Sequence, residues 1–282
     1  MRYYIVIPAH NEESFLGITL QSVMNQSLLP ERVVVVNDNS TDGTAKVVSG
    51  FTKMYPQVTC IEHTSEDNHV PGAKVVNAFL RGLQELDDDY ELLVKLDADL
   101  VLPTQYFEHI ASFLQANSKT GIVGGFAYER TADGWEKNHP MNEDHVRGGF
   151  KAYSAACYKA IGGLVSSIGW DTIDELLAKY HGFEVRTLPD LHIQHLRPTG
   201  TSYVPSAKKL QGRAMYVMRY GLLISSIASL KMAWKQRNFR VFVDNLKGYY
   251  EAKRLGLSYL INEEEGKFVR KLRWHGIRKA LF

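Results

Sequence analysis

Apolar runs alternate with amphipathic segments over the first hundred residues of this 282-residue chain. Continuous apolar runs, typical of strands buried on both faces, occupy residues 3–8, 32–36, 58–62 and 92–96. Apolar positions three or four residues apart predict helices over 12–24, from 42–44 toward Phe51, and over 72–86. This order predicts an α/β fold with a mostly parallel sheet and helices on both of its faces.

The pattern is less regular after residue 121. Strands are predicted over 122–128, 185–188 and 191–196, a polar loop containing Trp135 over 131–145, and a helix after Asp171. Beyond residue 206 the pattern is helical. We therefore expect an α/β domain of residues 1–206 followed by a helical extension of residues 207–282.

Charge is unevenly distributed between these two parts. The net charge is +2, but residues 207–282 contain 17 Lys and Arg against 5 Asp and Glu. A basic surplus of this size, around the apolar stretch 220–230, is typical of a segment that lies on an anionic membrane surface. Packing within the chain and a homodimer contact are the open alternatives, and no nucleic-acid partner is expected.

The sequence gives few indications of membrane insertion, secretion or disulfide formation. The sequence has no uncharged apolar run of about 18 residues and no signal-peptide pattern. We therefore expect a cytoplasmic protein, located peripherally at the inner face of the cytoplasmic membrane if the extension binds there. Cys60 and Cys157 lack metal-ligand spacing, so both are expected to be reduced, buried thiols.

Polar motifs follow three of the predicted strands, at the edge where parallel sheets bind ligands. They are Pro8-Ala9-His10-Asn11-Glu12, Asn37-Asp38-Asn39-Ser40 and Asp97-Ala98-Asp99. Strand alternation would place Asp97 and Asp99 on one side, where they repel unless a cation or a hydroxylated ligand separates them. Their oxygens suit Mg²⁺ or Mn²⁺, although an Asp-rich turn is the alternative for such a pair taken alone.

These motifs, followed by Ile161-Gly162-Gly163 before an acidic helix start, resemble those of family 2 glycosyltransferases with the GT-A fold over about residues 1–200. The resemblance implies inverting transfer of a sugar from a nucleotide diphosphate donor to an acceptor hydroxyl, aided by a divalent cation. Asp38 would bind the base, with UDP preferred and GDP left open. A saccharide or lipid-linked acceptor would place the reaction in cell-envelope polysaccharide or glycolipid synthesis.

The resemblance also assigns the remaining donor-binding residues. They are Pro8, Ala9 and Asn11 beside the nucleoside, Glu12 and Asp97 toward the ribose, Lys74 on the nucleotide, Arg197 on a phosphate, Asp99 on the metal, and His195 as a further metal ligand. Glu12 could instead be a first-turn helix acid, and Lys74 a solvated lysine. His195 could equally be a satisfied core histidine.

The resemblance also implies a general base 11 residues before a Gly-aromatic pair, and Asp171 stands in that relation to Gly182-Phe183. Trp170 occupies the position where the family usually has Glu, which leaves Asp174 as the rival base and Glu175 as a further candidate. Helix capping is the structural alternative for Asp171. Two other functions stay open, a nucleotidyltransferase and a catalytically silent nucleotide-sugar-binding protein on the same fold. The first is disfavoured because no Gly-rich phosphate loop follows the first strand.

Overall fold

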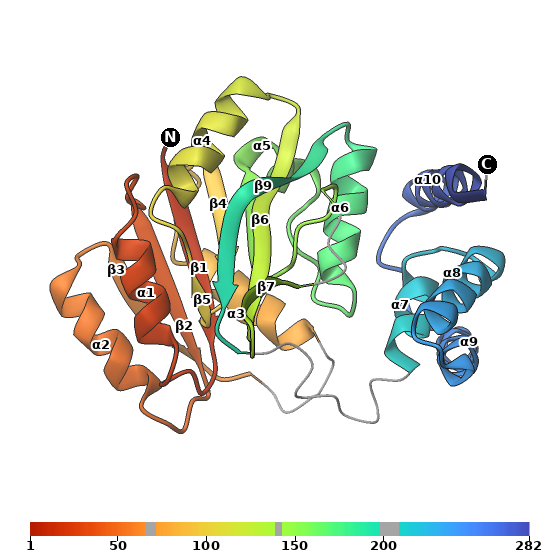
Figure 1. Ribbon diagram of the computed structural model, residues 1–282, viewed down its shortest axis with the longest axis horizontal. Helices are drawn as coiled ribbons and strands as arrows, with labels where there is room; N and C mark the ends of the chain where they lie inside the picture. The colour runs from red at the N-terminus through yellow and green to blue at the C-terminus, as the bar shows by residue number, and fades with distance from the viewer. Residues whose placement is uncertain (66–71, 139–142, 198–208, 282) are drawn as a thin grey trace.

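The computed structural model describes residues 1–65, 72–138, 143–197 and 209–281, and it combines an α/β part with a layer of C-terminal helices (Figure 1). Its strands form one sheet in the order β3-β2-β1-β4-β8-β6-β9-β5, and β7 pairs with β6. The strands are β1 (Tyr3–Ala9), β2 (Arg32–Asp38), β3 (Val58–His63), β4 (Leu92–Leu96), β5 (Leu100–Val101), β6 (Thr120–Thr131), β7 (Gly134–Lys137), β8 (Phe150–Ser154) and β9 (Glu184–His195).

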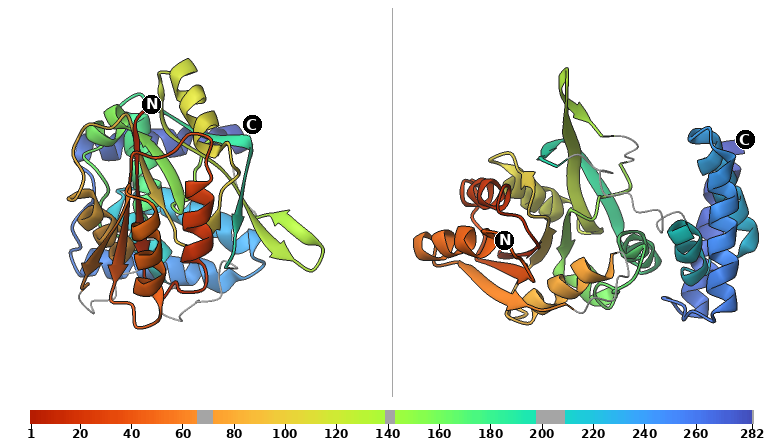
Figure 2. Two further views of the ribbon diagram at one scale, coloured as in Figure 1. Left: turned by 90° about the vertical axis from the view of Figure 1, so that its left-hand side faces the viewer. Right: turned by 90° about the horizontal axis from the view of Figure 1, so that it is seen from below.

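Helices cover both faces of this sheet, with α1, α2 and α4 on one side and α3 and α5 on the other (Figure 2). The helices are α1 (Leu16–Met24), α2 (Thr44–Met54), α3 (Ala73–Leu83), α4 (Tyr106–Ala116), α5 (Ala155–Ala160), α6 (Trp170–Tyr180), α7 (Leu210–Val217), α8 (Leu222–Lys235), α9 (Phe239–Arg254) and α10 (Glu263–Leu281). The predicted α/β class is therefore confirmed.

The first half of the sheet is parallel. β1 lies between β2 and β4 and is parallel to both, and β2 is parallel to β3. β4 and β8 are antiparallel, as are β8 and β6, while β6 and β9 are again parallel. The carboxyl ends of β1, β2 and β4 consequently meet at one edge, which is where the polar motifs were predicted to gather.

Several predicted elements need correction. The segment 101–119 contains α4, which the sequence pattern did not predict, and the first helix begins at Leu16 rather than at residue 12. The expected loop over 131–145 contains β7, because Gly134 adopts a φ of +120° and lets the chain turn back onto β6. The two strands expected over 185–196 are one strand, β9.

The C-terminal helices form a layer of their own beside α6 (Figure 2). α7 and α9 approach closely, since a Cβ on Gly212 would lie 1.8 Å from the Asn245 carbonyl oxygen. Contact with the α/β part includes Tyr180 of α6 and Phe268 of α10, whose ring centroids are 5.5 Å apart. The predicted boundary between residues 206 and 207 lies outside the described residues.

Two remaining expectations concern membranes and thiols. Within the described ranges, no helix has the length and apolar character needed to cross a bilayer. Both cysteines are free: Cys157 is buried, as predicted, whereas Cys60 is half-buried. Burial raises the pKa of the Cys157 thiol to about 12 and that of Cys60 to about 11, so both stay protonated near neutral pH.

Candidate active site

Asp38 closes β2 and is nearly enclosed, with 6% of its surface exposed. Its Oδ1 accepts a hydrogen bond of 2.9 Å from the backbone N–H of Ser65, which ties the end of β2 to the segment after β3. The ring of His10 reaches the carbonyl of Asp38, with 2.6 Å between Nδ1 and the oxygen. The loop after β1 is thus bound to the end of β2.

Asn11 strengthens the same connection. It adopts a φ of +54°, and its side-chain oxygen accepts the backbone N–H of Thr41 at 2.8 Å, while its own N–H donates to Ser40 Oγ at 3.0 Å. The side chain predicted to line the nucleoside site therefore joins two loops. Ala9 is buried and Pro8 half-buried at the end of β1, and Lys74 is half-buried in the first turn of α3.

The carboxylate pair lies in a turn after β4 rather than within the strand. The buried hydroxyl of Thr19 on α1 holds this turn, donating to the Ala98 carbonyl at 2.7 Å and accepting the Leu100 N–H at 3.0 Å. Strand alternation therefore does not govern the two side chains, contrary to the sequence-based expectation. The protein itself supplies cations for both carboxylates.

Asp97 is ion-paired with Lys95, a buried lysine inside β4, while 37% of the Asp97 side chain remains exposed. Asp99 is more enclosed. Its Oδ2 lies 3.3 Å from Nε2 of His195 and 4.0 Å from Nε of Arg197. The structure therefore brings Asp99, His195 and Arg197 together, whereas Asp97 is paired with Lys95.

His195 lies near the end of β9 and is flanked by two carboxylates, Asp99 and Glu129, whose Oε1 is 3.5 Å from Nδ1. Burial disfavours the charged imidazole, but Asp99 and Asp97 outweigh it and raise the pKa of His195. Arg197 forms an ion pair of 2.6 Å with Glu12. Burial raises the pKa of Glu12 to about 7, against the opposing effect of Arg197.

Two consecutive glycines separate the carboxylate pair from the predicted base. A Cβ on Gly149 would lie 2.6 Å from Oδ2 of Asp97, and one on Gly148 would lie 2.8 Å from the Trp170 ring and 3.2 Å from Cβ of Asp171. The Gly149 carbonyl also accepts the N–H of Asp97 at 2.7 Å. A side chain at either glycine would therefore press against the Asp97 carboxylate or the Trp170 ring.

Asp171 and Asp174 occupy different environments on α6. Asp171 is half-buried in the first turn, and no described residue donates a hydrogen bond to its carboxylate. Asp174 is buried, with Lys151 Nζ at 2.8 Å and 2.9 Å from its two oxygens and the Tyr153 hydroxyl at 2.6 Å. These contacts support Asp171 over Asp174 as the group able to accept a proton.

Comparison with known proteins identifies the family of the chain. The profile described as Glycosyl transferase family 2 matches residues 4–167, which include the loops after β1, β2 and β4. This match covers more than half of the chain. The chain belongs to glycosyl transferase family 2.

Relatives in the family include the probable glycosyltransferase YdaM of Bacillus subtilis, 30% identical over 123 residues, or 43% of this chain and 28% of that protein. The poly-beta-1,6-N-acetyl-D-glucosamine synthase of Staphylococcus epidermidis is 27% identical over 120 residues, or 43% of this chain and 27% of that protein. The chain thus spans about a quarter of the length of each of these curated relatives.

Solved structures of glycosyltransferases share the fold. The mannosyltransferase PcManGT of Pyrobaculum calidifontis, in complex with GDP-Man and Mn²⁺, superposes with a TM-score of 0.59 at 17% identity, covering 100% of this chain and 81% of that one. Residues 1–349 of S. aureus TarS, in complex with UDP-GlcNAc, give 0.57 at 17% identity, covering 95% and 78%. At this identity the likeness establishes the fold.

This family 2 member holds its site with residues that sequence analysis did not select. They are Lys95, Glu129, Gly148, Gly149 and Lys151. The two lysines left a signal, since each interrupts an apolar strand with a charge that must find a buried partner. Glu129 and the glycines left none, because their neighbours come from distant parts of the chain.

Proposed function

We propose that this protein is an inverting glycosyltransferase that moves a sugar from a nucleoside diphosphate donor to an acceptor hydroxyl. The observation that carries the proposal is the contact chain from Asp97 through Gly149 and Gly148 to Asp171. Asp171, whose carboxylate accepts no hydrogen bond from the described residues, thus lies beside Asp97, which is paired with Lys95. Both are at the edge of the sheet where ligands bind. A leaving-group side and a base side are thus adjacent.

On this proposal Asp171 accepts the proton of the acceptor hydroxyl while the oxygen of that hydroxyl bonds to the anomeric carbon and the bond from this carbon to the diphosphate breaks. Arg197 stabilises the charge of the departing diphosphate, and Asp38, Asn11 and Lys74 bind the nucleotide. Asp174 is assigned to holding α6 in place, because its carboxylate is fully paired with Lys151 and Tyr153.

A divalent cation, Mn²⁺ or Mg²⁺, fits beside Asp99 and His195. The facing atoms are 3.3 Å apart, close to the spacing of roughly 3 Å between neighbouring ligands of an octahedral ion with bonds of about 2.1 Å. No group of three or more His, Cys, Asp or Glu side chains suited to a metal occurs in the described parts of the chain. Donor phosphate oxygens would therefore complete the coordination, and the ion would neutralise their charge.

UDP is the donor base that we propose first, with GDP as the alternative. A carboxylate such as Asp38 can accept a hydrogen bond from the ring N–H of either uracil or guanine. The structural neighbours include complexes with both a GDP-sugar and a UDP-sugar, so they favour neither base. We propose a saccharide or lipid-linked acceptor in cell-envelope synthesis, and one relative carries the name of a polysaccharide synthase.

The proposal is tested by incubating the protein with a panel of nucleotide sugars, Mn²⁺ and saccharide or lipid-linked acceptors, and measuring nucleoside diphosphate release. Release that depends on acceptor supports glycosyl transfer, whereas pyrophosphate release would show a nucleotidyltransferase. Binding is measured separately by thermal shift with UDP, GDP, CMP and dTDP, since ligand at 100 times its dissociation constant stabilises by about 2.7 kcal/mol. A catalytically silent protein would bind nucleotide without turnover across the acceptor panel.

A further inference from the structure

Helix α8 buries Ile224 and Ala233, but it also turns two serines inward and large apolar side chains outward. Ser225 and Ser229 are fully buried, and neither hydroxyl has a hydrogen-bond partner among the described residues. Large apolar side chains project outward instead, with 61% of Leu223, 52% of Leu230 and 85% of Trp234 exposed. Burying hydroxyls while exposing tryptophan is unfavourable in water, so this face requires a covering partner.

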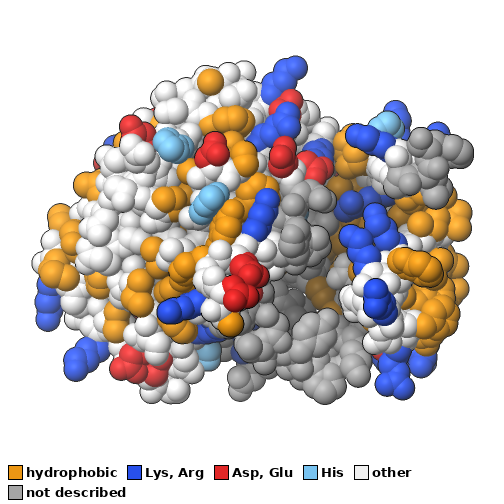
Figure 3. All heavy atoms as spheres, viewed as in Figure 1, with side chains coloured by type: hydrophobic (Ala, Val, Ile, Leu, Met, Phe, Trp, Pro, Cys, Tyr) orange, Lys and Arg blue, Asp and Glu red, His pale blue; other side chains and the backbone are white. Residues whose placement is uncertain are grey.

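The exposed residues of α8 form a continuous stripe. Leu223, Leu230 and Trp234 follow one another at seven and four positions, with the half-buried Ile227 between them, which is the spacing of a single helix face. Figure 3 shows hydrophobic and basic side chains gathered on the C-terminal helices. The stripe therefore presents one apolar surface rather than scattered apolar residues.

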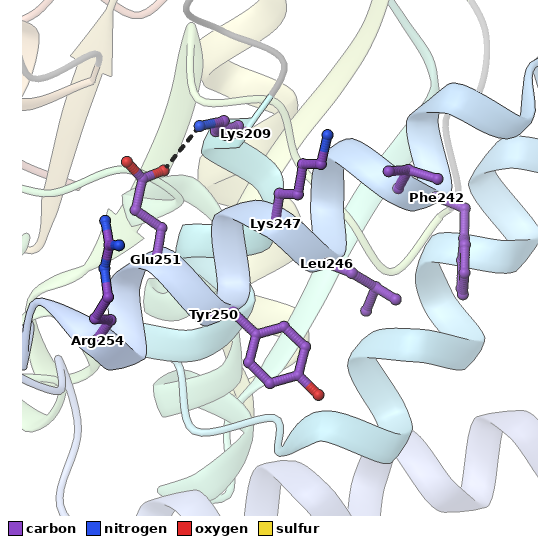
Figure 4. Close-up of a pocket in the computed structure, with 8 residues that line it drawn as sticks. Lys209, Phe242, Leu246, Lys247, Tyr250, Glu251 and Arg254 are labelled. Carbon is purple, nitrogen blue, oxygen red and sulfur yellow. Dashed lines mark ion pairs between the residues drawn. The ribbon is translucent and has the colours of Figure 1, made fainter.

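Helix α9 extends this surface. Phe239 is 65% exposed and its ring centroid lies 5.3 Å from that of Phe242, and Tyr250 is 50% exposed further along the helix. Phe242, Leu246 and Tyr250 line a groove of about 460 Å³ on this helix, apart from the site at the sheet edge. Figure 4 shows their side chains projecting from α9, with Lys247 and Arg254 beside them.

Cations surround the two stripes. The exposed basic side chains of α8, α9 and the turn between them are Lys231, Lys235, Arg237, Arg240, Lys247, Lys253 and Arg254. None of them forms an ion pair with another residue that the structure describes. The same segment contains only two acidic residues, Asp244 and Glu251, and Glu251 is already paired with Lys209 and Arg213.

We propose that α8 and α9 form a membrane-binding surface that lies on an anionic lipid bilayer. The apolar stripes would enter the boundary between headgroups and acyl chains, and the cations would contact lipid phosphates. Charge decides between this occupant and a second copy of the chain. Two such surfaces in contact would oppose seven basic residues to seven others, whereas an anionic bilayer complements them.

The test uses the full chain without nucleotide sugar, so it stands apart from the proposed glycosyl transfer. Binding is measured by flotation with vesicles of phosphatidylcholine alone or mixed with phosphatidylglycerol. We expect binding to the anionic vesicles, weakened by salt, and a reduction of roughly tenfold or more in both L230S/W234S and K231E/K235E. The matched controls M54S and K46E/K53E change exposed residues of α2 and should bind as the wild type does.

Two results would overturn the proposal. One is vesicle binding that L230S/W234S leaves unchanged. The other is a wild-type protein that does not bind anionic vesicles but forms a dimer in light scattering, with the dimer lost in L230S/W234S. That result would assign the surface to a second copy of the chain. Circular dichroism and thermal melting of each variant show that the helices remain folded.

Discussion

Lys95 on β4 and Lys151 on β8 lie directly opposite each other in antiparallel register, and both are buried. Two like charges in this position repel unless each has its own counter-charge. Lys95 pairs with Asp97, and Lys151 pairs with Asp174 and Glu175. The Trp170 ring lies 5.4 Å from one ammonium and 5.8 Å from the other. One buried ionic layer therefore positions both the Asp97 carboxylate and the helix that carries Asp171.

Removing the Lys151 charge should destabilise the fold strongly. Burial opposes charge on this ammonium, but Asp174 and Glu175 raise its pKa, so it stays charged. K151M would leave the buried Asp174 carboxylate without a cation and Glu175 with His145 as its remaining partner, and it should cost about 3–5 kcal/mol in urea unfolding. K179M breaks a surface pair of 3.1 Å with Asp144 and should cost less than about 1 kcal/mol. Equal losses would contradict the buried ionic layer.

Asp171 and Asp174 should separate catalysis from stability. D171N keeps the size of the side chain but removes the proton acceptor, so transfer should fall by roughly 10²–10⁴-fold with donor binding retained. D174N weakens the contacts of Lys151 and should lower the melting temperature. The comparison is made by turnover and thermal unfolding of both variants. Near-normal transfer in D171N beside a folded, inactive D174N would move the base to Asp174.

Asp99 should account for metal-dependent nucleotide binding. D99A is expected to abolish the Mn²⁺-dependent part of the thermal stabilisation by nucleotide, because it removes the more enclosed carboxylate of the pair. H195A should weaken the same effect. D190A, which changes an exposed carboxylate on β9, serves as the control. Full metal dependence in D99A would show that Asp99 is not the principal ligand.

A side chain at Gly149 should leave the stability of the fold almost unchanged but disturb donor binding. In G149A the new Cβ meets Oδ2 of Asp97, the end of a side chain that can rotate, so stability should change little while donor affinity falls. G50A serves as the control, since nothing lies within 4 Å of its Cβ, and Ala is favoured over Gly in the helix by about 0.5–1 kcal/mol. Unchanged donor affinity in G149A would show that the Asp97 position is unimportant.

His145 should make stability fall with rising pH. Its hydrogen bond of 2.9 Å to Glu175 raises its pKa above the ordinary 6.5, so the folded state binds the proton more tightly than the unfolded state does. The stabilisation is complete below pH 6.5 and is lost as the pH rises through the raised value. The free energy of unfolding in urea is measured for wild type and H145Q at several pH values across this range. The same pH dependence in both proteins would contradict the role of His145.

Local patterns in the sequence predicted much of the fold. The apolar runs of β1, β2 and β4 are continuous because both faces of these strands are buried, and a parallel sheet brings the loops that follow them to one edge. Asp38, Asp97 and Asp99 could therefore be placed at that edge, whereas His195 was assigned beside Asp99 by the family resemblance. Helix α4 carries the same kind of signal, because its buried positions Tyr106, Phe107, Ile110, Ala111 and Leu114 recur three or four residues apart, although no helix is predicted over 101–119.

The sequence by itself determined which residues meet at the sheet edge, because that depends on the order of strands and on motifs a few residues long. Only the tertiary structure decided what each of them contacts. Lys95 and Lys151 are 56 positions apart, and Gly149 reaches Asp97 across the sheet, so no local pattern reveals their contacts. The face that α8 turns toward the protein was also decided by tertiary packing. Its apolar stretch predicted a helix, but packing against distant segments buried Ser225 and Ser229 and left Leu223 and Trp234 in solvent.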